Sequence, residues 1–335
     1  MTITINRRQL IKNTSTLIAA SLLHQLGFSQ TENPYRGSYD KTATGELVTE
    51  GIDLSGKLFA VTGCNSGLGF ETMRVLSLRG AHVIGIARTL EKAEAACQLI
   101  AGKTTPLACE LSNFQSVVDC SEAIKALNQP LDSLICNAGI MELPELEQVN
   151  GLEKHFVVNH LGHFILTLRL EETIKAAEQG RVVMLSSGRY KSAPEAGIEF
   201  DNLSGEKNYD PLTAYGQSKL ANALFSQELS RRFAADNSNA TSNAVLPGVI
   251  MTNLGRHMPA WKTTAAKLIG WTFMRSVEEG VATSCYVATH PKLVDTSGHM
   301  FINCNPFTPE GVHMTDRQLA SQLWDVSVEL TKDYL

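Results

Sequence analysis

The feature that most constrains the fold is a glycine-spaced loop between an apolar segment and a helical one. Leu58–Thr62 has the character of a short buried strand, and residues 67–79 have helical spacing. Between them lies Thr-Gly-Cys-Asn-Ser-Gly-Leu-Gly, residues 62–69. Glycines permit tight backbone angles and let a pyrophosphate approach the chain, and the free N–H groups at a helix start attract its charge. The loop therefore predicts a dinucleotide site, with contacts from Gly63, Asn65, Ser66, Gly67, Leu68 and Gly69.

Apolar and amphipathic segments alternate through the rest of the chain. The segments with the character of buried strands are 58–62, 82–87, 106–109, 132–136, 181–186, 241–246 and 299–303. Helical patterns cover 67–79, 114–127, 151–177, 214–235 and 277–289. This alternation predicts an α/β protein, a doubly wound parallel sheet (Rossmann fold) of about seven strands with helices on both faces. Right-handed crossovers would bring the carboxyl ends of the strands to one edge, where ligands bind.

The first 54 residues differ from the rest. Arg7 and Arg8 open the run Arg-Arg-Gln-Leu-Ile-Lys, which resembles a twin-arginine export signal, and a moderately apolar stretch follows. Residues 1–30 are therefore interpreted as a signal for export to the periplasm; the alternative is a cytoplasmic protein whose basic extension lies on a membrane surface or has no role. Residues 31–54 are polar and turn-rich and are interpreted as a linker. Residues 55–335 are expected to form a single domain.

Composition narrows the function classes. The formal net charge is −5, which argues against a nucleic-acid partner because such proteins carry a basic surface. Hydrophobic residues make up 43% of the chain, enough for a sizeable core. The seven cysteines are scattered, with no Cys-x-x-Cys pair and no histidine at ligand spacing. They predict buried free thiols and no metal site.

The end of the second predicted strand bears on the choice between NAD and NADP. A carboxylate at this position would bind the ribose hydroxyls of NAD. This sequence has no acid there and ends Ile-Ala-Arg, with Arg88 last. Because a guanidinium pairs with a phosphate through two N–H donors, Arg88 favours NADP(H) over NAD(H). The alternative is that Arg88 is a solvated residue at a helix start.

Residues 55–310 carry a set of motifs that resembles the short-chain dehydrogenase/reductase superfamily. The motifs are Thr62-Gly63-x-x-x-Gly67-x-Gly69, Asn137-Ala138-Gly139, Asn159 in Val-Asn-His-Leu-Gly, Ser186-Ser187, Tyr215-x-x-x-Lys219, and Pro247-Gly248 with Thr252. The sequence around Asn159 and Tyr215 is similar to the retinol-dehydrogenase-like and WW-domain-oxidoreductase-like branch. The resemblance implies an NAD(P)-dependent oxidoreductase that interconverts an alcohol and a carbonyl group.

Tyr215 and Lys219 are the predicted acid–base pair. They lie four residues apart in a helical segment, so both side chains project from one face. A phenol with a pKa of about 10 is a poor base at neutral pH, but a neighbouring ammonium favours the phenolate. We therefore expect Lys219 to lower the pKa of Tyr215 toward neutrality. Ser187 is expected to hydrogen-bond the substrate oxygen, and the resemblance selects it over Ser186.

The resemblance also assigns roles around this pair. Asn159 would hold a water that connects Lys219 to bulk solvent, and Lys219 would bind the nicotinamide ribose. The cofactor site would further include Glu110, Leu111, Asn137, Ala138, Gly139, Pro247, Gly248 and Thr252. Glu110 departs from the family, which usually has Asp at this point to contact the adenine. His160 and His163 are interpreted as packing or hydrogen-bonded residues.

Residues 253–275 are expected to cover the substrate. They hold the large apolar side chains of Met258, Trp261, Leu268, Ile269, Trp271, Phe273 and Met274. Such a cover suggests a small lipophilic alcohol, aldehyde or ketone; the alternative is a stripe buried in the core, a membrane or a subunit interface. Two other functions stay open: a nucleotide-sugar epimerase or dehydratase, which the glycine spacing disfavours, and a non-catalytic NADP-binding sensor or partner-binding protein. The resemblance also suggests a homo-oligomer.

Overall fold

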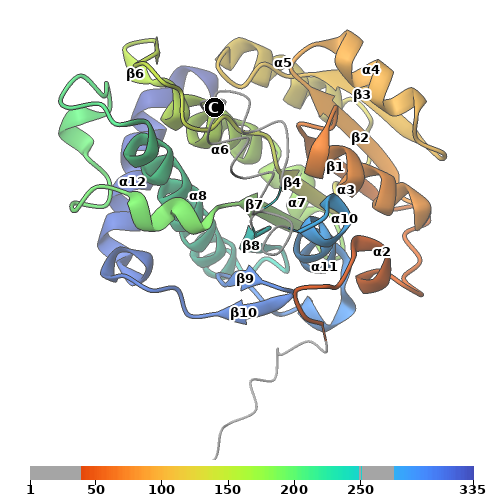
Figure 1. Cartoon of the computed structure of the whole chain (residues 1–335). Coiled ribbons are helices and arrows are strands. Elements are labelled where there is room, and N and C mark those ends of the chain that lie inside the picture. Colours follow the sequence, from red (N-terminus) through yellow and green to blue (C-terminus); the bar gives the residue numbers. More distant parts are fainter. Residues whose placement is uncertain (1–38, 249, 251–274) are drawn as a thin grey trace, which may run out of the picture. The chain divides into compact units, whose positions relative to one another are not determined.

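The computed structural model describes residues 39–248, 250 and 275–335, and a mainly parallel sheet runs through them (Figure 1). Its strands are β1 (Leu58–Thr62), β2 (His82–Ala87), β3 (Thr104–Ala108), β4 (Ser133–Cys136), β7 (Arg181–Leu185), β8 (Thr241–Leu246), β9 (Met300–Ile302) and β10 (Asn305–Phe307). Within the described residues they pair in the order β10-β9-β8-β7-β4-β1-β2-β3. Neighbouring strands are parallel, except that β10 is antiparallel to β9. The predicted doubly wound sheet is confirmed.

Helices cover both faces of this sheet. They are α2 (Gly45–Val48), α3 (Gly67–Leu78), α4 (Leu90–Gln98), α5 (Phe114–Lys125), α6 (Gly162–Arg169), α7 (Glu171–Lys175), α8 (Pro211–Ala235), α10 (Val277–Gly280), α11 (Ala282–Thr289) and α12 (Arg317–Thr331). Leu58 and Ala60 of β1 pack into the core shared with α5, α6, α8 and α12. Phe59 and Val61 pack into the core shared with α2, α3, α4 and α11. Successive side chains of a strand point to opposite faces, so one apolar strand supplies two cores.

The strand β10 was not predicted from the sequence. Asn303 and Cys304, which join it to β9, have φ of 54° and 60°. Two consecutive positive φ values are typical of the tight turn whose twist matches paired strands. Asparagine is a common residue at such a turn but cysteine is not, and the pattern therefore gave no hairpin signal.

Residues 151–177 do not form the single long helix that the sequence predicted. A short antiparallel ribbon, β5 (Gln148–Val149) and β6 (Leu152–Glu153), precedes the helical part. Asn150 and Gly151 make its turn, with φ of 53° and 75°. Asn-Gly is a strong two-residue hairpin signal, and here it outweighs the helical spacing that follows. The helical part begins as a π-helix, η1 (Phe156–Leu161), and continues as α6 and α7.

The interpretation of residues 31–54 as a linker is wrong for the part that the structure describes, residues 39–54. Thr44 caps α2 by accepting from the N–H of Leu47 at 3.2 Å. Ala43, Val48 and Leu54 are buried in the core shared with α3 and α11. These apolar residues are too widely spaced to stand out among polar neighbours, but each enters the core because α2 packs beside α11.

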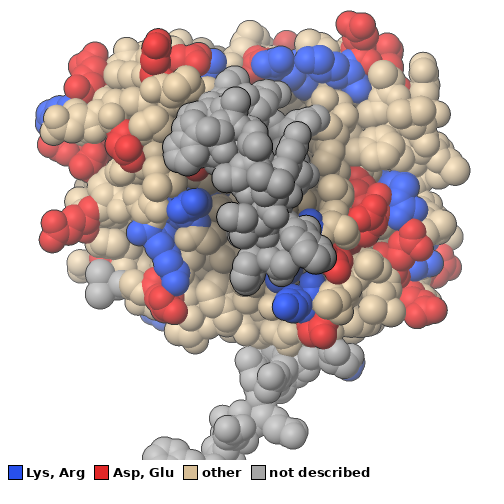
Figure 2. Space-filling view, viewed as in Figure 1, with Lys and Arg blue, Asp and Glu red and all other residues tan. Residues whose placement is uncertain are grey.

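Two predictions from composition can be compared with the described surface and core. All seven cysteines are buried and free, as predicted. On the face shown in Figure 2, Lys and Arg side chains lie in several small groups beside Asp and Glu. None of the described helices combines the length and the apolar character that crossing a membrane requires.

Candidate active site

The loop between β1 and α3 has the backbone geometry predicted for a pyrophosphate site. Gly63 and Gly67 have φ of 72° and 53°, in the region that favours glycine. A Cβ atom on Gly69 would lie 2.2 Å from the Gly63 carbonyl oxygen, so only glycine lets α3 begin this close to β1. The Ser66 side chain makes no capping hydrogen bond within the described residues. The N–H groups of the first turn of α3 are therefore suited to an anionic ligand.

A cavity of about 570 Å³ extends along the carboxyl edge of the sheet, from this loop to Tyr215. It includes residues at the ends of β1 and β4, between which the strand order reverses, and this is where open α/β sheets bind ligands. The predicted residues that line it are Gly63, Asn65, Ser66, Gly67, Leu68, Arg88, Glu110, Leu111, Asn137, Ala138, Gly139, Tyr215, Lys219 and Pro247. The shape and the glycine loop fit a dinucleotide.

The turn after β4 is fixed to β1 through Thr62. The Thr62 hydroxyl accepts from the backbone N–H groups of Asn137 and Ala138 at 2.9 Å each, and the Asn137 amide donates to the Thr62 carbonyl at 2.8 Å. His163 Nε2 lies 2.9 Å from the same hydroxyl, and its Nδ1 lies 3.0 Å from the Asn159 carbonyl oxygen. Because a carbonyl can only accept, Nδ1 carries the proton and Nε2 accepts from Thr62. Burial lowers the pKa of His163 to about 4, so it is a neutral hydrogen-bonded residue, as predicted.

Tyr215 and Lys219 lie on α8 and meet the end of β7. Ser187 makes a side-chain hydrogen bond to Tyr215. Lys219 Nζ lies 5.7 Å from the centroid of the Tyr215 ring and donates to the Leu185 carbonyl at 3.2 Å. The Ser186 hydroxyl instead donates to the backbone carbonyl of Lys219 at 2.8 Å. Of the two serines, Ser187 is thus the one beside Tyr215, and the structure brings together the three residues selected from the sequence.

Burial controls the proton affinities of this pair. Tyr215 is 3% exposed and Lys219 is 4% exposed. Loss of water raises the pKa of Tyr215 to about 12, although the hydrogen bond from Ser187 acts in the opposite direction. Burial also lowers the pKa of Lys219 to about 8. The predicted lowering of the Tyr215 pKa is therefore wrong for this arrangement, because desolvation outweighs the opposing effects of Ser187 and of the charge on Arg189. The phenol keeps its proton at neutral pH.

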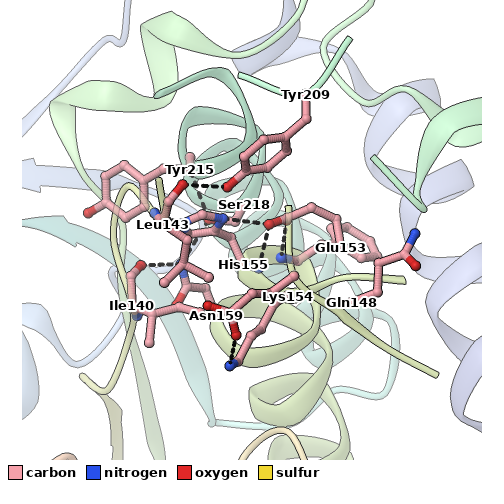
Figure 3. Close-up of polar contacts among 12 residues, drawn as sticks. Ile140, Leu143, Gln148, Glu153, Lys154, His155, Asn159, Tyr209, Tyr215 and Ser218 are labelled. Carbon is pink, nitrogen blue, oxygen red and sulfur yellow. Dashed lines mark hydrogen bonds and ion pairs between the residues drawn. The ribbon is translucent and has the colours of Figure 1, made fainter. Parts of the chain in front are cut away.

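Asn159 lies in the π-helix η1 and holds the chain that leaves β4. Its Oδ1 accepts from the Ile140 N–H at 2.8 Å, and its Nδ2 donates to the Ile140 carbonyl at 3.0 Å and to Ser218 Oγ at 2.9 Å (Figure 3). Single π-turns inside helices are frequent at functional sites. The structure thus gives Asn159 a role in fixing the cavity wall, and the water contact implied for it stays a prediction.

Arg88 and Glu110 face each other at the far end of the cavity. Arg88 Nε lies 3.7 Å from Glu110 Oε2, and Lys92 lines the cavity beside them. Glu110 Oε1 accepts from the N–H and hydroxyl of Ser112, at 3.2 and 2.8 Å. The Arg88 side chain is 59% exposed, so its guanidinium remains accessible to an anion despite the nearby carboxylate.

The last predicted segment is described only in part. Gly248 has φ of 89°, and a Cβ atom there would lie 2.7 Å from Arg275 Nε. Arg275 also hydrogen-bonds the Asn303 side chain. Thr252 lies outside the described residues, as does the predicted substrate-covering segment, 253–275, apart from Arg275.

Several residues of the cavity wall were missed in the sequence. Among them are Ile140, Met141, Leu143, Lys154 and Val158. A signal was available for the first three, because they directly follow the predicted cofactor motif at residues 137–139. Lys154 and Val158 reach the cavity only because the ribbon β5–β6 and η1 fold back beside that segment.

Comparison with known proteins agrees with this geometry. The family model described as short chain dehydrogenase matches residues 57–263. The chain is 38% identical to the protein named short-chain dehydrogenase TIC 32 A, chloroplastic, of Brassica napus, over 89% of this chain and 95% of that protein. It is 36% identical to the human WW domain-containing oxidoreductase, over 93% of this chain and 78% of that protein. It is also 36% identical to human retinol dehydrogenase 14, over 82% of this chain and 86% of that protein.

The family model spans more than half of the chain, and each of these relatives is aligned over most of its length. The glycine loop, the reversal of strand order and the cluster of Tyr215, Lys219 and Ser187 fall within the matched residues. This chain belongs to the NAD(P)-dependent short-chain dehydrogenase/reductase family and is an oxidoreductase.

Proposed function

We propose that this chain interconverts an alcohol and a carbonyl compound with NADP(H), and that Tyr215 is the acid–base residue. The proposal is supported above all by the position of Tyr215, which contacts Ser187 and, with Lys219, lines the same cavity as the glycine loop. When bound, NADP(H) supplies or accepts the hydride.

Each of the three side chains has a separate task in this proposal. The substrate oxygen lies between Ser187 and Tyr215, where the Ser187 hydroxyl donates a hydrogen bond to it and stabilises developing negative charge. Tyr215 gives its proton to this oxygen in reduction and takes it back in oxidation. Lys219, held by the Leu185 carbonyl, provides positive charge beside the phenol and binds the ribose hydroxyls of the cofactor. Asn159 fixes the wall at Ile140.

The proton states favour carbonyl reduction at neutral pH. Burial raises the pKa of Tyr215 to about 12 and lowers that of Lys219 to about 8. At pH 7 the phenol is protonated and ready to donate, and Lys219 is still charged. Above pH 8 Lys219 loses its charge, so the rate of reduction is expected to fall through that range.

Two cations support the preference for NADP(H). Arg88 and Lys92 line the end of the cavity that follows β2, where the adenosine ribose of a dinucleotide is held in this fold. We predict that Arg88→Asp raises the Kd for NADPH about 10- to 100-fold, because charge-assisted hydrogen bonds to the 2′-phosphate are lost. The Kd for NADH should change much less. Fluorescence titration with both cofactors measures this, and equal losses for the two would refute the phosphate contact.

A lipophilic substrate is supported by the cavity wall and by one relative. Ile140, Met141 and Leu143 line the cavity near Tyr215. One relative, 36% identical to this chain, is named a retinol dehydrogenase. We infer a small alcohol, aldehyde or ketone with an apolar body, and we assign its cover to residues 253–275.

The role of the N-terminal segment and the oligomeric state of the chain are also proposed here. We infer that residues 1–30 are a targeting segment, and the chloroplastic name of the Brassica relative supports targeting of some kind. The relatives give no support to a periplasmic destination. We also propose a homo-oligomer, which size-exclusion chromatography with light scattering would test.

The central test uses Tyr215→Phe. Loss of NADPH fluorescence in the presence of a panel of apolar aldehydes and ketones measures turnover, and we expect the substitution to lower kcat by about 10²- to 10⁴-fold, since it removes the proton donor. NADPH binding should be retained. The matched control is Tyr286→Phe, a buried tyrosine on the other side of the sheet.

The outcomes separate the two candidate functions. Turnover that survived Tyr215→Phe would exclude Tyr215 as the acid–base residue. A wild-type protein that bound NADPH but reduced no compound in the panel would support the alternative, a non-catalytic NADP-binding sensor or partner-binding protein.

A further inference from the structure

The cavity wall beside Tyr215 is fixed by side chains that have no role in the proposed chemistry. Leu143, which lines the cavity, donates its N–H to His155 Nε2 at 3.2 Å. Its carbonyl oxygen accepts from the Tyr209 hydroxyl at 2.8 Å (Figure 3). His155 precedes the π-helix η1, and Tyr209 precedes α8, so two distant parts of the chain meet at one residue of the wall.

The orientation of His155 is set by a buried carboxylate. Because the Leu143 N–H can only donate, Nε2 of His155 accepts and Nδ1 carries the proton. Nδ1 donates to Glu153 Oε1 at 2.5 Å. Glu153 also accepts from the backbone N–H groups of His155 and Phe156, at 2.9 Å each. Glu153 is 2% exposed and His155 is fully buried, and these bonds satisfy a carboxylate that would otherwise be costly to bury.

The wall between its two anchors includes a strained residue. Ile140 is held on both its N–H and its carbonyl by Asn159. Leu143 is held on both sides by His155 and Tyr209. Between them Glu142 has φ of 46°, a conformation that residues other than glycine adopt at a cost. Such a conformation persists where the surrounding contacts hold the chain firmly. Here both anchored residues, Ile140 and Leu143, lie within two residues of Glu142.

The anchored wall is coupled directly to Tyr215. The rings of His155 and Tyr215 meet edge to face, with centroids 6.1 Å apart. The carboxylate of Glu142 is near enough to act on Tyr215 electrostatically. A shift of Leu143 would therefore change the space next to the reacting hydroxyl.

We propose that Glu153, His155 and Tyr209 are positioning residues: through Leu143 they fix the cavity wall beside Tyr215 and so determine which carbonyl substrates reach it. This inference rests on the proposed function for its substrate part. Its structural part, that His155 and Tyr209 fix the backbone of Leu143, can be tested by hydrogen exchange without measuring turnover.

The test compares His155→Phe with a matched control. Phenylalanine preserves the ring that contacts Tyr215 but removes the acceptor for the Leu143 N–H and the donor to Glu153 Oε1. The control is His160→Phe, a histidine 1% exposed on the same helical segment, which bonds Ser327 of α12 instead. Amide hydrogen exchange over residues 140–147 should become about tenfold faster in His155→Phe and stay unchanged in the control. Unchanged exchange in His155→Phe would overturn the proposal.

Steady-state kinetics with the aldehyde panel give the second measurement. In His155→Phe we expect KM for the bulkier apolar aldehydes to rise about tenfold while kcat changes by less than about threefold, since the wall and not the acid–base group is altered. The Kd for NADPH should equal that of the wild type. A uniform loss of kcat and of NADPH binding would indicate a merely structural role and contradict the proposal.

Tyr209→Phe provides an independent variant in case His155→Phe does not fold. Tyr209 is only partly buried, and the substitution removes a single hydrogen bond to the Leu143 carbonyl. The same increases in exchange and in KM are expected. If exchange responds but the wild-type protein reduces no member of the panel, the proposed function fails together with the substrate part of this inference.

Discussion

Lys219 is the residue where the demands of chemistry and of folding conflict most. Its ammonium is almost fully buried, and the burial lowers its pKa from 10.5 to about 8. The hydrogen bond to the Leu185 carbonyl compensates only in part, and Asn222 Nδ2 donates to the same oxygen at 3.1 Å. A charge kept in such a place weakens the fold at neutral pH, which is a common property of functional sites.

We predict that Lys219→Met stabilises the protein at neutral pH while it abolishes turnover. The folded pKa lies below the unfolded value, so between pH 8 and about 10.4 the unfolded chain binds more protons and stability rises with pH. Below pH 8 the wild-type protein is destabilised by the full cost of burying the charged ammonium of Lys219, which is at most about 3 kcal/mol. Methionine removes it, and Asn222 still satisfies the Leu185 carbonyl.

Denaturant unfolding at pH 7 and pH 10 measures this difference. The advantage of Lys219→Met should be largest at pH 7 and should shrink toward pH 10. A difference in the free energy of unfolding that did not depend on pH would show that burial of the charge is not its cause.

Two helical elements carry Tyr215, Lys219 and Asn159, and they differ in how far their sequence specifies them. α8 begins after Asp210, whose carboxylate accepts from the Thr213 N–H at 2.7 Å, and Pro211 is its first residue. A capping Asp followed by Pro is a local signal that fixes the helix start and hence the direction of Tyr215. At the start of η1, the carboxylate of Glu153 accepts from the Phe156 N–H at the same spacing of three residues, at 2.9 Å. Glu is not among the preferred capping residues and no Pro follows it, so this start is specified less strongly.

At the scale of the whole molecule, the described core reaches further toward the N-terminus than the sequence pattern indicated. Val48 of α2 is 1% exposed, and a Cβ atom on Gly45 would lie 2.8 Å from a methyl group of Val281. Arg79, at the end of α3, donates to the Glu46 carbonyl at 2.7 Å. α2 is thus part of the folded unit and not a tether.

We predict that Val48→Ala lowers the free energy of unfolding by about 2 kcal/mol, from lost burial plus a residual cavity. Its neighbour Leu47 is 48% exposed, and Leu47→Ala should change stability by less than about 0.5 kcal/mol. Urea unfolding of both variants measures the contrast. Equal, small effects would mean that α2 contributes nothing to the core.

The sequence by itself determined the sheet, the glycine loop and the identity of the clustered residues, because strand burial, helix caps and glycine requirements are local properties. It predicted the bounds of β1, β2 and β8 as the structure has them and those of β3, β4, β7 and β9 to within about two residues, and it predicted the cluster of Tyr215, Lys219 and Ser187. It did not predict the pKa values of Tyr215 and Lys219, which depend on how much water the packed chain excludes. Nor did it predict the contacts of Leu143 with His155 and Tyr209, since hydrogen bonds between segments 12 and 66 residues apart exist only once the chain has folded.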